Sequence, residues 1–156
     1  MRLQMQEDQI EKQIQINAPV ARVWRALTNH DEFGQWFGVS IEGPFVAGES
    51  SRGHMTIPGY EHVKWDVVVQ EIDAARHVFA YTWHPYAIEA ERDYSDEPST
   101  RVEFRLEPSG DGTSLSVTES GFSKLPADRL PEAYRMNTRG WESQLDDIKI
   151  HAEQNS

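Results

Sequence analysis

The sequence predicts an α+β protein in which an antiparallel sheet covers a long C-terminal helix. Apolar residues alternate with polar ones through most of residues 39–120, as they do in half-buried strands. Short links such as PSGDGT (108–113) separate these runs, and links this short join antiparallel rather than parallel strands. Residues 130–152 then place apolar side chains at helical spacing. The sheet is the only predicted surface large enough to cover that helix.

The chain is expected to open with a strand and a short helix. QIEKQIQI (9–16) alternates apolar and polar residues, which indicates a strand with one half-buried face. Asn17 and Pro19 then mark a helix start, because Asn can accept a bond from a free backbone N–H and Pro is tolerated in the first turn. The apolar face of this helix is expected to consist of Val20, Val23, Trp24 and Leu27.

A second short helix is expected directly after the first. Asn29 followed by Glu32 resembles a capping box, and Gly38 is a typical helix end. Between them, Phe33, Trp36 and Phe37 share one face. Trp24 on the first helix is assigned to the core, whereas Trp36 and Phe37 are candidates for a gate to a binding site.

The remaining elements are predicted from the same two patterns, alternation for strands and a repeat of 3.6 residues for helices. Strands are expected around residues 63–70, 78–83, 101–107 and 114–118. AGESSRG (47–53) has turn composition, and the acidic stretch 85–99 predicts a longer, mobile link. The C-terminal helix is expected to run for about 20 residues, or about 30 Å, with an apolar stripe interrupted by one polar side chain. That stripe is Leu130, Tyr134, Asn137, Trp141, Leu145, Ile148 and Ala152.

Composition narrows the possible functions. A length of 156 residues suits one compact domain, placed at residues 9–153 after a loose segment at 1–8. The formal net charge of −11 argues against binding to nucleic acid or anionic lipid. The absence of cysteine excludes disulfides and thiol chemistry. With no signal peptide and no membrane span of about 18 apolar residues, the expected location is the cytoplasm.

Four motifs resemble one protein family in the same order along the chain. They are INAPVARVWRALTNHDEFGQWF (16–37), FAYTWH (79–84), STRVEFRLEPSGDGTSLSVTESGF (99–122) and GWESQLDDI (140–148). The family is that of homologues of the activator of heat-shock-protein-90 ATPase, similar to its C-terminal domain, within the START-like, SRPBCC or polyketide cyclase superfamily. The resemblance implies a helix-grip fold, in which a curved sheet of about six to seven strands wraps around the C-terminal helix. It also implies a cavity between the two.

We expect a small hydrophobic or aromatic molecule to bind in this cavity. Aromatic side chains suit such a site because they bury large areas, while Tyr and Trp keep a polar tip. Asn137 interrupts the helical stripe and therefore needs a polar partner. The candidate ligand-binding residues are Trp36, Phe37, His54, Trp65, Tyr81, Trp83, Phe104, Phe122, Tyr134, Asn137 and Trp141.

Two other functions stay open. The family resemblance implies a chaperone-associated role, acting through the outer face of the sheet or through DYSDEP (93–98). Polar residues that could face inward include His54, Glu119, Asn137 and Arg139, and an enzyme of the cyclase or hydrolase kind would need His54, Asn137 or Arg139 inside the cavity. Arg101 and Glu103 should instead lie outside in cross-strand ion pairs, opposite in parity to Phe104. No metal site, cofactor or catalytic set is predicted, because no metal-binding or nucleophile–base spacing is present.

Overall fold

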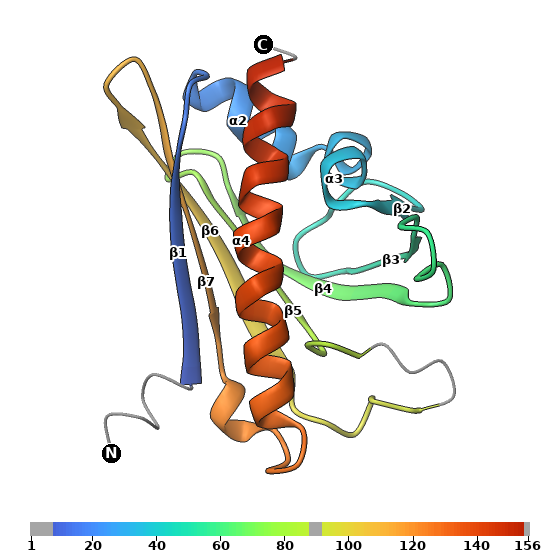
Figure 1. Ribbon diagram of the computed structural model, residues 1–156. Helices are drawn as coiled ribbons and strands as arrows, with labels where there is room; N and C mark the ends of the chain where they lie inside the picture. The colour runs from blue at the N-terminus through green and yellow to red at the C-terminus, as the bar shows by residue number, and fades with distance from the viewer. Residues whose placement is uncertain (1–7, 88–91, 155–156) are drawn as a thin grey trace.

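The computed structural model, which describes residues 8–87 and 92–154, contains a seven-stranded antiparallel sheet with a 25-residue helix packed against it (Figure 1). The strand order is β1-β7-β6-β5-β4-β3-β2, so the first strand pairs with the last and closes one side of the sheet. The strands are β1 Gln9–Ile16, β2 Val39–Ile41, β3 Ser50–Met55, β4 Lys64–Asp73, β5 Val78–Trp83, β6 Thr100–Ser109 and β7 Gly112–Ser120.

Both short helices form where the sequence predicts them, but their N-termini are capped differently. Helix α2 (Val20–Thr28) begins after Pro19, and no side chain caps it. The predicted cap by Asn17 is wrong, because Pro19 occupies the N-cap position; the backbone N–H of Asn17 donates to Glu153 (2.7 Å). Asn29 does cap α3 (His30–Phe37) by accepting a bond from the N–H of Glu32 (3.1 Å).

The stretch AGESSRG proves to be partly strand rather than turn. Strand β3 begins at Ser50 and pairs with both β2 and β4. A Cβ atom at Gly53 would lie only 1.9 Å from the carbonyl oxygen of Ser40. Glycine is therefore required by the close approach of β2, and the composition that resembles a turn reflects strand packing.

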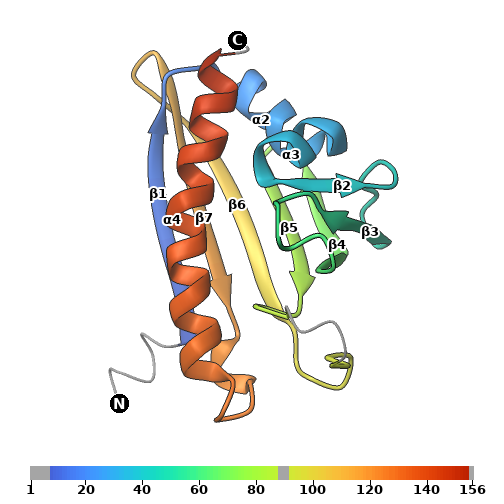
Figure 2. The same cartoon turned by 45° about the vertical axis from the view of Figure 1, so that its right-hand side comes forward.

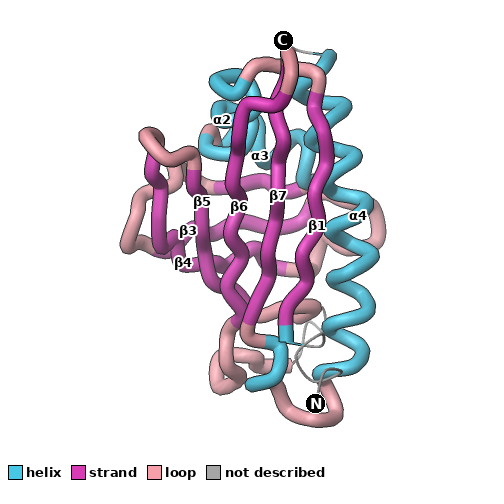
Figure 3. Tube along the Cα trace, turned by 90° about the vertical axis from the view of Figure 1, so that its left-hand side faces the viewer, coloured by secondary structure: helices cyan, strands magenta, loops and turns pink. Residues whose placement is uncertain are grey.

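Helix α4 (Leu130–Gln154) lies along the inner face of the sheet, beside β1 (Figures 1 and 3). Its buried side chains include Trp141, Leu145 and Ile148, as the predicted stripe requires. Helices α2 and α3 lie next to the C-terminal half of α4, on the side of β2 to β4 (Figure 2). The sheet and these helices together enclose the apolar core.

The N-terminal segment is anchored where the structure describes it. Residues 1–7 of the predicted loose segment lie outside the described residues. Asp8 accepts hydrogen bonds from the backbone and hydroxyl groups of Ser123, and its own carbonyl accepts one from the N–H of Gly121 (3.0 Å). Asp8 therefore belongs to the folded part of the chain.

The acidic link between β5 and β6 is held by Arg129, at the start of α4. Residues 88–91, at the centre of the predicted mobile link, lie outside the described residues. The buried guanidinium of Arg129 donates to the carbonyl oxygens of Pro85 (2.8 Å) and Tyr86 (3.1 Å) and pairs with Glu97 (3.0 Å). It also lies over the ring of Tyr94, 4.8 Å from the centroid. The described flanks of this link are thus fastened to the helix.

No helix among residues 8–87 and 92–154 is long and apolar enough to cross a membrane.

Candidate ligand-binding pocket

A pocket of about 470 Å³ lies between α4, α3 and strands β3 to β5. Its volume falls within the range of small-molecule sites, roughly 300–1,000 Å³. Segments 62–66, 84–87 and 92–95 contribute to its lining. Its aromatic wall consists of Phe37, Trp65, Trp83 and Trp141.

The four wall aromatics form one connected group of rings. Trp83 and Trp141 lie 5.8 Å apart between centroids, with their planes tilted by only 31°. Phe37 meets Trp65 edge-on at 5.3 Å and lies within 6.3 Å of both other rings. Rings at these distances stabilise one another. The wall therefore presents fixed ring surfaces contributed by a short helix, two strands and the long helix.

A buried carboxylate, Glu119 on β7, holds two of these rings in place. Its side chain is fully buried. Its Oε2 accepts the indole N–H of Trp83 (2.7 Å), and its Oε1 accepts that of Trp141 (2.8 Å). Thr100 Oγ1 donates to Oε2 (2.5 Å), and Asn137 Nδ2 donates to both oxygens (3.0 and 3.2 Å). Three residues of the pocket wall thus converge on one carboxylate.

The environment of Glu119 both opposes and favours its charge. Burial raises its pKa above the ordinary value, although hydrogen bonds from Thr100, Trp83, Trp141 and Asn137 lower it in part. A carboxylate that accepts from four side chains has the hydrogen-bonding pattern of the ionised form, which can only accept. Burial and the nearby Glu119 charge also raise the pKa of Tyr81 well above its ordinary value.

From the sequence, Glu119 is predicted only as one of several polar residues that could face inward. A stronger signal was available, because Glu119 shares its strand parity with Leu115 and Val117. All three side chains are buried on the inner face of β7. A carboxylate among the apolar residues of one strand face is buried with them, and it therefore needs several hydrogen-bond donors.

Helix α4 lines the pocket with Asn137, Gly140, Trp141 and Gln144. These positions are spaced i, i+3, i+4 and i+7, so they share one helix face. A Cβ atom at Gly140 would meet no other atom within 4 Å. Gln144 donates its Nε2 to the carbonyl oxygen of Phe37 (2.9 Å). Its buried Oε1 has no hydrogen-bond partner among the described residues.

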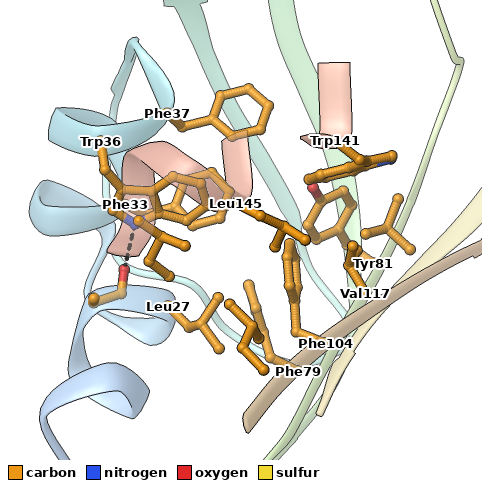
Figure 4. Packing of buried hydrophobic residues seen from close by; sticks show 14 of the residues in the cluster. Leu27, Phe33, Trp36, Phe37, Phe79, Tyr81, Phe104, Val117, Trp141 and Leu145 are labelled. Atoms are coloured by element: carbon orange, nitrogen blue, oxygen red, sulfur yellow. Dashed lines mark hydrogen bonds between the residues drawn. The ribbon is translucent and has the colours of Figure 1, made fainter. Parts of the chain in front are cut away.

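The structure brings some of the predicted site residues to the pocket and leaves others in the core. Phe37, Trp65, Trp83, Asn137 and Trp141 line it. The predicted gate role of Trp36 is wrong, because Trp36 is buried and donates its indole N–H to the carbonyl oxygen of Ala26 (2.8 Å; Figure 4). Its ring packs against Phe33 in the centre of the core, 4.7 Å between centroids.

The other predicted site residues lie away from the pocket lining. Tyr81 and Phe104 are buried core residues beneath Trp141 (Figure 4). Phe122 packs edge-on against Tyr134 (5.3 Å), and the hydroxyl of Tyr134 donates to the carbonyl oxygen of Gln9 (3.0 Å). Phe122 and Tyr134 therefore belong to the packing between α4, β1 and the short turn after β7.

Two of the polar residues that were candidates to face inward, His54 and Arg139, face outward. His54 is exposed, because its parity on β3 is that of exposed Arg52 and opposite to that of buried Ser51. Arg139 is exposed on α4. The inward placement considered for both residues is therefore wrong. As expected, Arg101 and Glu103 lie on the face of β6 opposite to buried Phe104. They pair with each other along the same strand (2.7 Å), and Arg101 also pairs across the sheet with Glu71 on β4 (3.6 Å).

In the described part of the chain, no three His, Cys, Asp or Glu side chains are placed to hold a metal ion. The pocket lining offers aromatic ring faces, amide groups and several charged side chains, among them Lys64, Asp66, Arg92 and Asp93. This chemistry suits non-covalent recognition of a small molecule.

A curved antiparallel sheet that grips a long C-terminal helix, with two short helices after its first strand, defines the helix-grip or START-like class of protein. Residues 17–153 match the family model described as Activator of Hsp90 ATPase homolog 1-like protein. The chain belongs to this family. Among curated proteins, none matches the sequence.

Several solved structures share the fold. Protein MLL2253 from Mesorhizobium loti is 22% identical, with a TM-score of 0.74, and the match covers 95% of this chain and 98% of that protein. The Aha1 dimer from Colwellia psychrerythraea is 19% identical (TM-score 0.68, covering 93% and 96%). DynU16, from the dynemicin biosynthetic locus, is 20% identical (TM-score 0.71), and the match covers 94% of this chain but 47% of DynU16. At these identities the similarity establishes the fold alone.

Proposed function

We propose that the protein binds a small, largely aromatic or hydrophobic molecule in the pocket between α4 and strands β3 to β5. The observation that carries this proposal is the fixation of Trp83 and Trp141 by Glu119. A fully buried carboxylate is expensive to maintain. Here it holds two rings of a pocket wall in a defined orientation, which is the preorganisation that tight ligand binding requires.

Gly140 supports the same conclusion from the helix side. Glycine within a helix costs about 0.5–1 kcal/mol relative to alanine. Gly140 lies in the interior of α4, lines the pocket and has open space where a side chain would be. No packing contact therefore demands glycine at this position. Room for a bound molecule explains it.

A pocket-filling variant tests the proposal. Gly140→Leu would project a side chain into the open space. The control, Gly43→Leu, would do so at a partly buried bend after β2, where a Cβ atom also meets no atom within 4 Å and which lies outside the pocket lining. Binding of 1-anilinonaphthalene-8-sulfonate, 2-naphthol and a flavonoid is followed by tryptophan fluorescence and amide chemical shifts. The wild type and Gly43→Leu should bind at least one probe, and Gly140→Leu should bind it at least tenfold more weakly. Binding that is equal in all three proteins, or absent from the wild type, would refute the proposal.

Family membership favours a second candidate, association with a chaperone. The exposed Asp96 and the partly buried Tyr94 lie in the acidic segment 93–98, outside the helix–sheet core. Charge reversal at Asp96 should weaken capture of heat-shock protein 90 and stimulation of its ATPase, whereas Glu49→Lys, at an exposed position before β3, serves as the control. If the unmodified protein neither binds the chaperone nor stimulates it, this candidate fails. A cytoplasmic location stays a prediction from composition.

A further inference from the structure

The indole N–H groups of the pocket wall are not available to a ligand. Trp83 and Trp141 both donate to Glu119, and Trp65 donates to the hydroxyl of Ser51 (3.0 Å). An indole has one donor and no acceptor. These three rings therefore offer a ligand their faces and edges, but no hydrogen bond. Polar recognition must come from other side chains.

The α4 side of the pocket supplies hydrogen-bond acceptors. Asn137 uses its Nδ2 on Glu119, so the polar atom that it has left for a ligand is Oδ1. Gln144 uses its Nε2 on the carbonyl oxygen of Phe37, and its Oε1 is buried without a partner among the described residues. The two residues are seven positions apart, about 10 Å along one face of the helix. Both amides are thus oriented by bonds to their nitrogen atoms.

The unpartnered oxygen of Gln144 is costly in the free protein. A buried acceptor without a donor has lost its hydrogen bond to water and gained none in return. Gln144 is partly exposed and lines the pocket, so its amide lies next to a molecule bound there, and a rotation of the side chain would be needed to turn Oε1 towards that molecule. A ligand donor would supply the hydrogen bond that this oxygen lacks among the described residues.

The charges around the pocket disfavour an anion at this inner end. Glu119 lies directly behind Trp83, Asn137 and Trp141, and the protein as a whole carries a net charge of −11. The cationic residues of the lining, Lys64 and Arg92, are accompanied there by Asp66 and Asp93.

Arg92 is in addition paired with Glu97 (3.1 Å) and lies over the ring of Tyr94. The rim therefore provides little unbalanced positive charge to hold a carboxylate. A fatty acid or an aromatic acid would be a poor match for this pocket.

We propose that the ligand is a neutral, planar aromatic molecule that donates a hydrogen bond, from a hydroxyl or N–H group, to Oε1 of Gln144. This inference rests on the proposed binding function and adds the polarity of the ligand to it. Gln144 is then the residue that distinguishes a donor-bearing ring from an ether, a hydrocarbon or an acid of the same shape. The flat ring system lies against the aromatic wall and Gly140.

Three probes of one shape test the inference by titration calorimetry: 2-naphthol, 2-methoxynaphthalene and 2-naphthoate. The wild type should bind 2-naphthol about fivefold to tenfold more tightly than the methyl ether, since one neutral hydrogen bond contributes about 1 kcal/mol. Binding of 2-naphthoate should be weaker still. The side-chain amide resonances of Gln144 should shift with 2-naphthol and much less with the ether.

Gln144→Met removes the acceptor while keeping the length of the side chain. In this variant 2-naphthol and its ether should bind within about twofold of each other, whereas Gln154→Met, at the far end of the same helix and outside the pocket lining, should keep the wild-type preference. Equal binding of the two probes by the wild type, tighter binding of 2-naphthoate, or a preference that survives in Gln144→Met would overturn the inference and leave the binding function standing. Binding of none of the three probes would overturn the inference and contradict the proposed function as well.

Discussion

The indole N–H of Trp141 on α4 donates to Oε1 of Glu119 on β7 at 2.8 Å, although the two residues are 22 positions apart in sequence. This bond joins the long helix to the inner face of the sheet inside the apolar core. It also fixes the plane of the ring that forms one side of the pocket. A single polar contact thus contributes both to the packing of the helix and to the shape of the site.

Replacement of Glu119 by Gln should destabilise the protein and loosen the pocket. The new amide NH₂ would face donors such as the indole N–H of Trp83 or Trp141, leaving buried polar groups unpaired at a cost of about 2–4 kcal/mol. Urea unfolding should show this loss, and near-UV circular dichroism should show weaker tryptophan signals. The exposed Glu107→Gln on β6 serves as the control. A variant of unchanged stability and unchanged near-UV spectrum would contradict this account.

Gly140→Ala should make the protein more stable but a poorer binder. Alanine would gain about 0.5–1 kcal/mol of helix propensity, and its methyl group would enter open space without a clash. The free energy of unfolding should therefore rise, while the affinity for a pocket ligand falls by a smaller factor than in Gly140→Leu. Chemical denaturation and titration of the same samples check both effects. A loss of stability would show that Gly140 has a structural role that the packing does not reveal.

Stability should fall in acid partly through Glu32, which joins α3 to α2 and to the end of α4. Burial opposes the charge of Glu32, but bonds from His151 (2.9 Å), Arg22 (2.7 Å) and Arg25 (2.8 Å) lower its pKa overall. A carboxyl group with a lower pKa in the folded state binds more protons when unfolded. Its contribution is complete above the ordinary value of 4.5 and is lost as the pH falls through the folded pKa.

Urea unfolding between pH 3 and 7 measures this dependence. Glu32→Gln should be less stable than the wild type near neutral pH, and the difference should shrink below about pH 4.5. Glu42→Gln, an exposed residue next to β2, should follow the wild-type pH profile. A constant difference between Glu32→Gln and the wild type at every pH would contradict the assignment.

Replacement of Arg129 by Met should release the link between β5 and β6 from α4. The change removes the bonds to Pro85 and Tyr86 and leaves the largely buried Glu97 without this partner, at an expected cost of about 2–4 kcal/mol. Amide hydrogen exchange should speed up at residues 92–99. Arg139→Met, at an exposed position of the same helix, should leave exchange there unchanged. Unchanged exchange in Arg129→Met would show that the link is held by other contacts.

Local pattern predicted the elements well where one face of each is buried. The alternation in QIEKQIQI and the stripe through Trp141 and Ile148 lead directly to β1 and α4. Ser50 to Gly53 have the composition of a turn, because Gly and Ser favour turns. In the structure, however, Gly53 is required by the close approach of the backbone of a neighbouring strand. That neighbour cannot be read from the local sequence.

The candidate site was predictable only in part, for a similar reason. Helical spacing places Trp36 and Phe37 on the same buried face of the helix. It cannot tell which of the two lies in the core and which lines a pocket. Only the packed structure separates them: Trp36 turns its indole N–H to Ala26 within the core, and Phe37 lines the pocket. His54 shows the opposite case, in which the parity of a strand could not be assigned until its partners were known.

The sequence by itself determined the order of the elements, the buried face of most of them and the resemblance to a family, because each depends on residues close together in the chain. Tertiary structure alone decided where the pocket lies and that Glu119 supports its wall. Those features depend on contacts between β5, β7 and α4, whose relative positions arise from packing rather than from local periodicity. In the folded protein, four side chains that are distant in sequence donate hydrogen bonds to the buried Glu119 carboxylate. These bonds are what makes Glu119 part of the site.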